Sequence, residues 1–409
     1  MLLKNENQII RVLKSQGNKK ARKQTVNAAA ADNLQAQINL AEHIQVIASQ
    51  GRQVTVMITY KENWEETKRH FEAYWEKDYI DRCMLAMTVP RAGGKPLFPP
   101  RKPTPEAHFS DPQTIHEGML NGCAQTEYLC EAIPSRIIEF GVAGQCQFFG
   151  CRPNYTDNTI WFDPVLPEPD ANLLQYDDSR FQALKDLTAG LVSRAGKDYF
   201  VGMNDNCGII DALAHLRGTE NLLMDMVTEP EFVHAARDKI TEVWKRTQAE
   251  IFEMVKDNNL GGSSHGWMHL WSPKRHLQLQ CDYACMISPS MFEEFVLPEL
   301  EETASAFEHC TYHLDGIEQI RHLDLILSVK GIDNIQWTHV AGQPKTSASI
   351  EALQKIQAAG KGLVLIPQRD ELEFLMKNLS HKGLQICVGG MKDRQEAEDL
   401  MALARKLAH

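Results

Sequence analysis

The residues best suited to chemistry lie in one short run, TYHLDG, at positions 311–316. The run has the composition of a β-strand, so His313 and Asp315, two positions apart, are expected to project from the same face. Cys310, three positions before His313, is expected to face a layer of helices instead. Cys387 ends a later predicted strand, and with His313 and Asp315 it forms a nitrogen, oxygen and sulfur set that suits zinc. An open fourth position would let such a metal act as a Lewis acid or activate a thiol or water.

Other predicted strand ends carry carboxylates. Asp205 follows YFVGM and Asp282 follows LQLQC, and either side chain could serve as a catalytic general acid or base. In a metal-free alternative, Asp315 orients a neutral His313 as an acid–base pair, and Cys387 is simply buried. The sequence therefore leaves metal chemistry and acid–base chemistry open at one end of the predicted sheet.

Aromatic and basic side chains near these strand ends are expected to bind a substrate. The loop GGSSHGWMHLWSPKRH contains His265 and Trp267, and its small residues and tryptophans suit a lid with an aromatic wall. Trp337 and His339 end the strand NIQWTHV, and Arg91 follows MLAMTVP, where it could pair with a substrate carboxylate. The structural alternatives are a tryptophan pair covering an edge of the sheet and an ordinary surface arginine.

A regular alternation of strands and helices positions these residues. From residue 309 onwards, strands and helices alternate with a period of roughly 25 residues. This alternation implies a parallel sheet, and the uniform period favours a (β/α)8 TIM barrel over an open sheet, with the loops after the strands converging on one mouth. Strands at MLAMTV, YFVGM and LQLQC bring the total to seven, and the eighth is expected within 134–165. The helices are expected around 317–327, 349–358, 370–378 and 393–406.

Residues 1–52 differ from the rest of the chain. The stretch RVLKSQGNKKARKQTV is basic and contains several Gln and Asn residues, and apolar residues then recur at near-helical spacing until Gly51 ends the pattern. We expect an N-terminal helical arm over 1–52 and a barrel over 53–409. Because the barrel has its own core, the apolar face of residues 34–47 is expected to supply part of a homodimer interface.

Charge and composition exclude several functions. The formal net charge of −11 repels phosphate backbones, so no nucleic-acid partner is expected. No window approaches the roughly 18 apolar residues that cross a bilayer, and the start of the chain lacks the apolar region of a signal peptide. The ten cysteines are scattered, which is typical of reduced thiols. We therefore expect a cytoplasmic globular protein that does not enter membranes.

Two long blocks and the run YHLDG resemble the uroporphyrinogen decarboxylase superfamily. The blocks are GIIDALAHLRGTENLLMDMVTEPEFV and CDYACMISPSMFEEFVLPELEE, and the likeness covers roughly residues 200–405. This superfamily includes zinc-dependent methyltransferases that act on corrinoid proteins or thiols, and it is related to the barrel of cobalamin-independent methionine synthase. The true decarboxylases begin with an arginine-rich segment that has no counterpart here, so the resemblance points away from haem synthesis.

The resemblance also implies a metal site. In the zinc methyltransferases the strand similar to TYHLDG ends in His-x-Cys, and a later cysteine completes the site. His313 matches that histidine, Cys387 falls close to the later cysteine, and Asp315 stands where the first cysteine would be. A carboxylate in place of a thiolate keeps a zinc ligand but makes the metal harder, so a bound thiol is activated less.

The function implied by the resemblance is transfer of a methyl or other one-carbon group. The donor would be a small organic molecule, the acceptor a corrinoid or a folate-type compound, the cofactor zinc or another divalent metal, and the partner a corrinoid protein. One alternative is a decarboxylase or lyase for a small carboxylated substrate, with Asp205 or Asp282 as the acid–base group. A second alternative is a ligand-binding barrel without catalysis.

Overall fold

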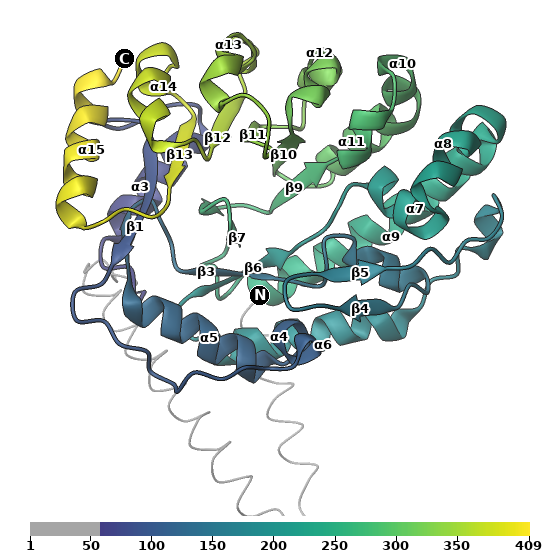
Figure 1. The fold of residues 1–409 in the computed structure, drawn as a ribbon, viewed down its shortest axis with the longest axis horizontal. Helices are drawn as coiled ribbons and strands as arrows, with labels where there is room; N and C mark the ends of the chain where they lie inside the picture. Colours follow the sequence, from purple (N-terminus) through teal and green to yellow (C-terminus); the bar gives the residue numbers. More distant parts are fainter. Residues whose placement is uncertain (1–57) are drawn as a thin grey trace, which may run out of the picture. The chain divides into compact units, whose positions relative to one another are not determined.

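A computed structural model of the chain describes residues 58–409. The arm predicted over residues 1–52 lies outside the described residues. The described chain is a mixed α/β structure in which helices flank a central, mostly parallel sheet (Figure 1). The α/β class predicted from the sequence is thereby confirmed.

One sheet of seven strands carries most of the candidate residues. Its spatial order is β2–β1–β13–β12–β11–β10–β9, and all neighbouring pairs are parallel except β1 with β2. Strands β9 to β13 are neighbours both along the chain and in space, as consecutive β–α units require. The strands are β1 Met84–Pro90, β2 Thr126–Cys130, β9 His276–Gln280, β10 His309–Asp315, β11 Asn334–Thr338, β12 Gly362–Leu365 and β13 Leu384–Val388.

The remaining strands form short pairs. β3 (Ser135–Ile138) falls in the segment 134–165, where the eighth barrel strand was expected, and it pairs in parallel with β6 (Phe200–Asn204). Within residues 58–409, backbone ladders do not join this pair to the seven-stranded sheet, so a closed barrel is not shown. The two antiparallel hairpins are β4 Pro153–Tyr155 with β5 Ile160–Phe162, and β7 Ser263–His265 with β8 Leu270–Ser272.

Helices follow the strands along the outer side of the sheet. Figure 1 shows α12 to α15 in chain order beside the arc of β10 to β13. The four helices expected after residue 316 correspond to η5 with α12, to α13, to α14 and to α15.

No helix among residues 58–409 has the length and apolar character needed to cross a bilayer. The α-helices are α3 Trp64–Trp75, α4 Pro105–Ser110, α5 Pro112–Gln125, α6 Asp178–Ala195, α7 Ile209–Arg217, α8 Thr219–Thr228, α9 Pro230–Val255, α10 Pro289–Met291, α11 Leu297–Ser305, α12 Leu323–Ser328, α13 Ile350–Ala358, α14 Leu372–Asn378 and α15 Arg394–Leu407. Shorter helical segments are η1 Gly144–Phe149, η2 Ala171–Leu173, η3 Asp282–Met286, η4 Phe292–Val296, η5 Ile317–His322, η6 Thr346–Ser349 and η7 Arg369–Glu371.

Strand alternation separates two environments on β10. Cys310 and Tyr312 are fully buried in the hydrophobic core, whereas His313 and Asp315 are only partly buried. The Cys310 Sγ lies 3.7 Å from the carbonyl oxygen of Ala304 in α11, so this thiol faces the helix layer as predicted. His313 and Asp315 project from the opposite face of the strand.

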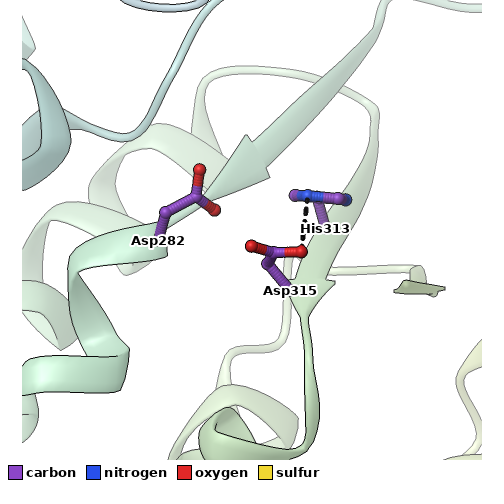
Figure 2. A group of neighbouring side chains, drawn as sticks. All are labelled: Asp282, His313 and Asp315. Atoms are coloured by element: carbon purple, nitrogen blue, oxygen red, sulfur yellow. Dashed lines mark ion pairs between the residues drawn. The ribbon is translucent and has the colours of Figure 1, made fainter. Parts of the chain in front are cut away.

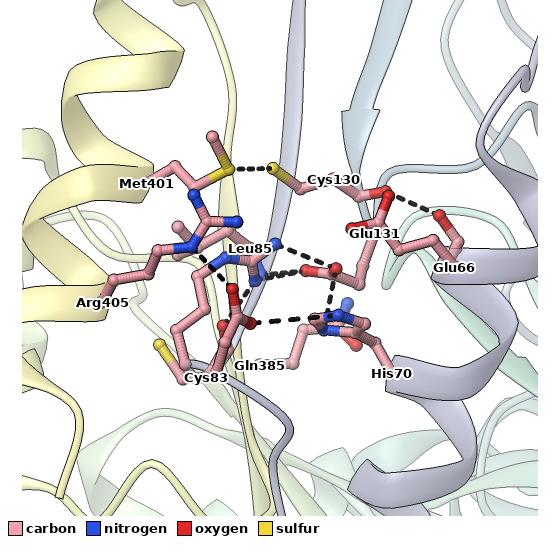
Figure 3. Close-up of polar contacts among 12 residues, drawn as sticks. Glu66, His70, Cys83, Leu85, Cys130, Glu131, Gln385, Met401 and Arg405 are labelled. Atoms are coloured by element: carbon pink, nitrogen blue, oxygen red, sulfur yellow. Dashed lines mark hydrogen bonds and ion pairs between the residues drawn. The ribbon is translucent and has the colours of Figure 1, made fainter.

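An ionic network, buried at Arg82 and Glu131 and exposed at Arg405, joins the first and last described helices to the start of β1 (Figure 3). Arg82 and Glu131 are 3% and 1% exposed, and two hydrogen bonds of 2.8 and 3.1 Å connect them. From α3, His70 Nδ1 lies 3.3 Å from the Glu131 carboxylate. From α15, Arg405 Nε donates to Asp81 at 2.6 Å. The network therefore fixes both helices against the same strand.

Candidate metal centre

Three potential metal ligands meet at the carboxyl ends of β9 and β10 (Figure 2). Asp282 begins η3 directly after β9, and His313 and Asp315 lie on β10. Each offers one ligand atom, and these atoms all lie within 4.8 Å of one another, a grouping that no other three His, Cys, Asp or Glu side chains of residues 58–409 achieve. His313 Nε2 is 3.9 Å from Asp315 Oδ1. This separation accommodates an ion between the two atoms, because zinc–ligand bonds to nitrogen and oxygen are about 2.0–2.2 Å long.

The neighbouring strand β11 fixes the orientation of His313. Gln336 is the register partner of His313, and its Oε1 accepts a hydrogen bond from His313 Nδ1. The Thr338 hydroxyl donates to the same Gln336 oxygen at 3.1 Å. Because Nδ1 donates, Nε2 carries the free lone pair, which is the arrangement found in metal-binding histidines. Burial lowers the pKa of His313, which favours the neutral ring that a metal requires.

Asp282 is a half-buried carboxylate with one oxygen held and the other free. Gln280 donates from Nε2 to Asp282 Oδ2 at 2.9 Å. Oδ1 is shielded from solvent and has no hydrogen-bond partner among the described residues. Burial, and then the neighbouring carboxylates of Asp211 and Asp315, raise the pKa of Asp282 to about 8. A shielded, unpartnered carboxylate oxygen is costly unless a cation or a proton balances it, so this position fits a metal ion.

The donor set determines which metals fit. Two carboxylates and one neutral imidazole suit zinc and also harder divalent metals such as manganese or iron(II). Three protein ligands leave at least one coordination position for substrate or water, as in catalytic zinc sites. Zinc, expected from the sequence, is therefore compatible with this set, although a carboxylate-rich site activates a bound thiol less than a thiolate-rich one.

Asp205 directly follows β6 and acts on Asp282 through its charge. Its backbone N–H donates to the carbonyl oxygen of Ile138, at the end of β3, at 2.9 Å. Burial, followed by the Glu139 carboxylate, raises the pKa of Asp205 to about 6, and Asp205 in turn contributes to the raised pKa of Asp282. Both residues predicted for acid–base chemistry thus have pKa values that suit proton transfer near neutral pH.

Two rings from the β7–β8 hairpin border on His313. The Trp267 ring lies 5.5 Å from the His313 ring at an angle of 81°, and Trp267 is 36% exposed. The His265 ring is 5.2 Å from Trp267 and is buried. Burial, followed by the neighbouring His313, lowers the pKa of His265 to about 3, so this ring stays neutral. Trp267 therefore offers an accessible aromatic surface beside the candidate metal ligands, and its contact with a substrate stays a prediction.

Cys387 is not a member of the ligand group. It lies on β13, which β12 and β11 separate from β10 along the sheet. Its Sγ is 3.3 Å from the carbonyl oxygen of Met268 and 3.4 Å from Nε2 of Gln385. Burial raises the pKa of this thiol to about 12, which disfavours the thiolate that binds metals. The structure therefore groups the two β10 side chains with Asp282 rather than with Cys387.

Three other residues predicted to bind substrate are engaged elsewhere. Trp337 is 2% exposed and belongs to the hydrophobic core, because strand alternation turns it toward the helices. His339 Nε2 lies 3.1 Å from the carbonyl oxygen of Gln343 in the loop after β11. Arg91 donates to the carbonyl oxygen of Thr126 at 3.0 Å and lines a cavity of about 320 Å³ bordered by β2 and α15. None of the three ligands lines that cavity.

The side chains that orient the ligands are not among the residues predicted from the sequence. Gln280, Gln336 and Thr338 belong to no linear motif, and their partners lie at the start of η3, on β10 and on β11. Their signal is a polar residue at every second position of an otherwise apolar strand, which marks a face that cannot be hydrophobic core. This pattern is present as His276, Gln278 and Gln280 on β9 and as Asn334, Gln336 and Thr338 on β11.

No protein-family model matches this chain, and no curated protein sequence matches it. Among solved structures, it is similar to a methyltransferase from Methanosarcina mazei, with a TM-score of 0.52 and 15% identity over 83% of this chain and 98% of that chain. At this identity the similarity shows a shared fold alone. The superfamily resemblance of the sequence blocks stays a prediction.

Proposed function

We propose that this protein is a metal-dependent methyltransferase that moves a methyl or other one-carbon group between a small organic donor and a corrinoid acceptor. The observation that carries the proposal is the grouping of the Asp282, His313 and Asp315 ligand atoms within 4.8 Å. The shared fold with a methyltransferase and the resemblance to the uroporphyrinogen decarboxylase superfamily support it. We also propose that β3 and β6 complete a (β/α)8 barrel with β1 and β9 to β13, which would place the ligand group at its mouth.

In the proposed site, Asp282, His313 and Asp315 hold one divalent metal, with zinc as the first candidate. When bound there, such a metal would supply Lewis acidity toward the heteroatom that carries the methyl group. Gln280 holds Asp282, and Gln336 holds His313, in the orientations that the metal needs. The chain's own contribution is thus to fix three ligands before the substrate arrives.

Other side chains act on the organic donor. Trp267 packs beside the donor and excludes water from one side of the site. Asp205, with a pKa of about 6, delivers a proton from its carboxyl group to the departing heteroatom. In this transfer the bond between the methyl group and the heteroatom would break. The heteroatom would keep that electron pair and take the proton from Asp205. A corrinoid acceptor at the cobalt(I) level would supply the pair for the new bond. The transfer is therefore balanced without a further oxidant or reductant.

A direct assay uses free cobalamin as the acceptor. Full-length protein loaded with Zn²⁺ is mixed with reduced cob(I)alamin and a panel of methylated alcohols, amines, thiols and aromatic ethers, and methylcobalamin is followed by its absorption. We expect transfer from at least one donor, and loss of transfer in Asp315→Asn and in metal-stripped protein. Equal transfer with and without metal would contradict the proposal. No turnover of any donor or carboxylic acid would favour the non-catalytic ligand-binding barrel.

The raised pKa values of Asp205 and Asp282 favour a second candidate, a decarboxylase or lyase without a metal. Such an enzyme needs a cation for the substrate carboxylate. Arg91, predicted for that role, donates instead to the Thr126 carbonyl. Release of CO₂ by metal-stripped protein, abolished by Asp205→Asn, would establish the lyase and displace the methyltransferase.

Three further proposals rest on the sequence. We propose a corrinoid protein as partner, a cytoplasmic location, and a homodimer in which residues 34–47 form part of the interface. Light scattering of the full chain and of a variant lacking residues 1–52 tests the last of these. We expect the full chain to have the mass of a dimer and the shortened variant to have the mass of a monomer. A shortened variant that is still a dimer would contradict the proposed interface.

A further inference from the structure

One buried carboxylate outside the ligand group holds the backbone that carries Asp282. Asp211 is the third residue of α7 and is 5% exposed. Its Oδ2 accepts hydrogen bonds from the backbone N–H groups of Gly208 and Asp282, both at 3.0 Å, and its Oδ1 accepts one from Tyr283 at 2.8 Å. Three backbone donors offset much of the cost of burying this charge.

Only one of these bonds is needed to cap a helix. The bond from Gly208 is the capping-box bond at the start of α7. The other two reach a different element, η3, which begins with Asp282 and Tyr283. Within the described chain, the side chain of Cys281, which precedes η3, accepts no capping hydrogen bond from it. Asp211 therefore caps two helical segments at once and joins the start of α7 to the end of β9.

The contact between α7 and β9 is close enough to require glycine. A Cβ atom on Gly208 would lie 2.0 Å from the carbonyl oxygen of Gln280 and 2.9 Å from Asp211 Oδ2. A side chain cannot be accommodated at the first of these distances without moving the backbone. The chain is thus held on both sides of the Asp282 Cα atom, by Gly208 against Gln280 and by Asp211 at Asp282 and Tyr283.

We propose that Asp211 is a positioning residue that fixes Asp282 for metal binding before the metal arrives. The inference rests on the proposed metal site. The free Asp282 oxygen is shielded and, among the described residues, has no partner, so an unrestrained backbone would relax to give it one. A ligand held in this way binds a metal without the entropy cost of ordering it.

Cobalt(II) titration tests this inference, because bound Co²⁺ reports its own coordination by visible absorption. Asp225 provides a matched control, since it is a 4% exposed aspartate in α8 that pairs with Arg217 at 2.7 Å. Metal-stripped wild type, Asp211→Asn and Asp225→Asn are titrated, and their melting temperatures are measured without metal. We expect Asp211→Asn to weaken Co²⁺ binding by roughly tenfold or more and to shift the absorption bands. Asp225→Asn should lower the melting temperature but leave affinity and bands unchanged.

Each outcome decides between the proposals. Wild-type affinity and bands in Asp211→Asn would overturn the positioning role and leave the proposed function intact. No Co²⁺ binding by the wild type would overturn the proposed function and this inference with it. Where Asp211→Asn does not fold, hydrogen exchange of the wild type decides. Equal protection of the Asp282 and Tyr283 amides with and without Co²⁺ supports preorganisation, and free exchange until Co²⁺ is added overturns it.

Discussion

His313 donates its Nδ1 hydrogen to Gln336, and its Nε2 lies 3.9 Å from Asp315. His313 and Gln336 are register partners on the adjacent parallel strands β10 and β11, so backbone pairing holds the imidazole and the amide together. Gln336 therefore selects which histidine nitrogen is available to a metal.

Replacing Gln336 with leucine removes this acceptor. We expect the affinity for Zn²⁺ to fall by about 10- to 100-fold, the usual effect of removing an outer partner of a metal-binding histidine. Isothermal titration of metal-stripped protein measures the change. Gln248→Leu is the control, because Gln248 is a buried glutamine in α9. Wild-type affinity in Gln336→Leu would show that Gln336 does not orient His313.

Replacing Asp282 with asparagine should change how stability depends on pH. Folding raises the pKa of Asp282 from 3.8 to about 8, so its contribution to stability is fully present below pH 3.8 and is lost as the pH rises through 8. Asp282→Asn removes this loss. Without metal, we expect the variant to gain stability over the wild type as the pH rises, reaching on the order of 5 kcal/mol at high pH.

Denaturant unfolding at several pH values measures this difference. With Zn²⁺ present, the wild type should become more stable than Asp282→Asn, because only the wild type gains free energy from binding the metal. A stability difference between the variant and the wild type that stays the same at every pH without metal would contradict the raised pKa.

Replacing Cys387 with serine should have a small effect. The Cys387 Sγ donates to the carbonyl oxygen of Met268, a contact that a hydroxyl can retain, so we expect a loss of about 1 kcal/mol in unfolding free energy with metal content unchanged. Metal analysis and thermal unfolding of the variant check both expectations. Joint loss of metal and activity would restore Cys387 as the thiolate ligand predicted from the sequence.

Removing Glu131 should destabilise the fold strongly. Glu131→Ala leaves Arg82 buried without its partner, and such unpaired charges cost about 3–5 kcal/mol. The control is Glu302→Ala, which breaks the exposed pair with Lys245 and should cost about 0–1 kcal/mol. Denaturant unfolding compares the two variants. Equal stabilities would mean that the network of Figure 3 does not hold the helices in place.

The carboxyl-terminal β–α units could be predicted because their signals are local. Each strand is a short apolar run, and each helix repeats its apolar residues along one face. The helix expected at 393–406 spans Arg394–Leu407, and the strand expected at TYHLDG spans His309–Asp315. Asp282 and Asp205 could also be placed at strand ends in this way.

The residues that support the ligands could not be predicted, because their roles depend on contacts between elements. The bond from His313 to Gln336 follows from the register of two strands, which neither strand encodes alone. Asp211 carries a weak local signal, Gly-x-x-Asp before an apolar helix, which predicts a cap. That signal contains nothing about its second contact, with η3.

Cys387 and Trp337 mark two limits of reasoning from strand ends. Strands lie about 4.8 Å apart, so a residue three strands along a sheet is a neighbour only where curvature brings it back. Cys387 lies on β13, the third strand along the sheet from β10. Trp337 lies between Gln336 and Thr338 on β11. Successive side chains of a strand point to opposite faces, so Trp337 points away from the face that carries Gln336 and Thr338.

The metal content of the purified protein tests the central claim most directly. Full-length wild type, Cys387→Ser and the double variant His313→Ala with Asp315→Asn are loaded with Zn²⁺, freed of excess ion and analysed by plasma mass spectrometry. If Asp282, His313 and Asp315 form the site, the wild type and Cys387→Ser each retain roughly one zinc per chain and the double variant retains none. A wild type without zinc, or a double variant that retains it fully, would contradict the claim.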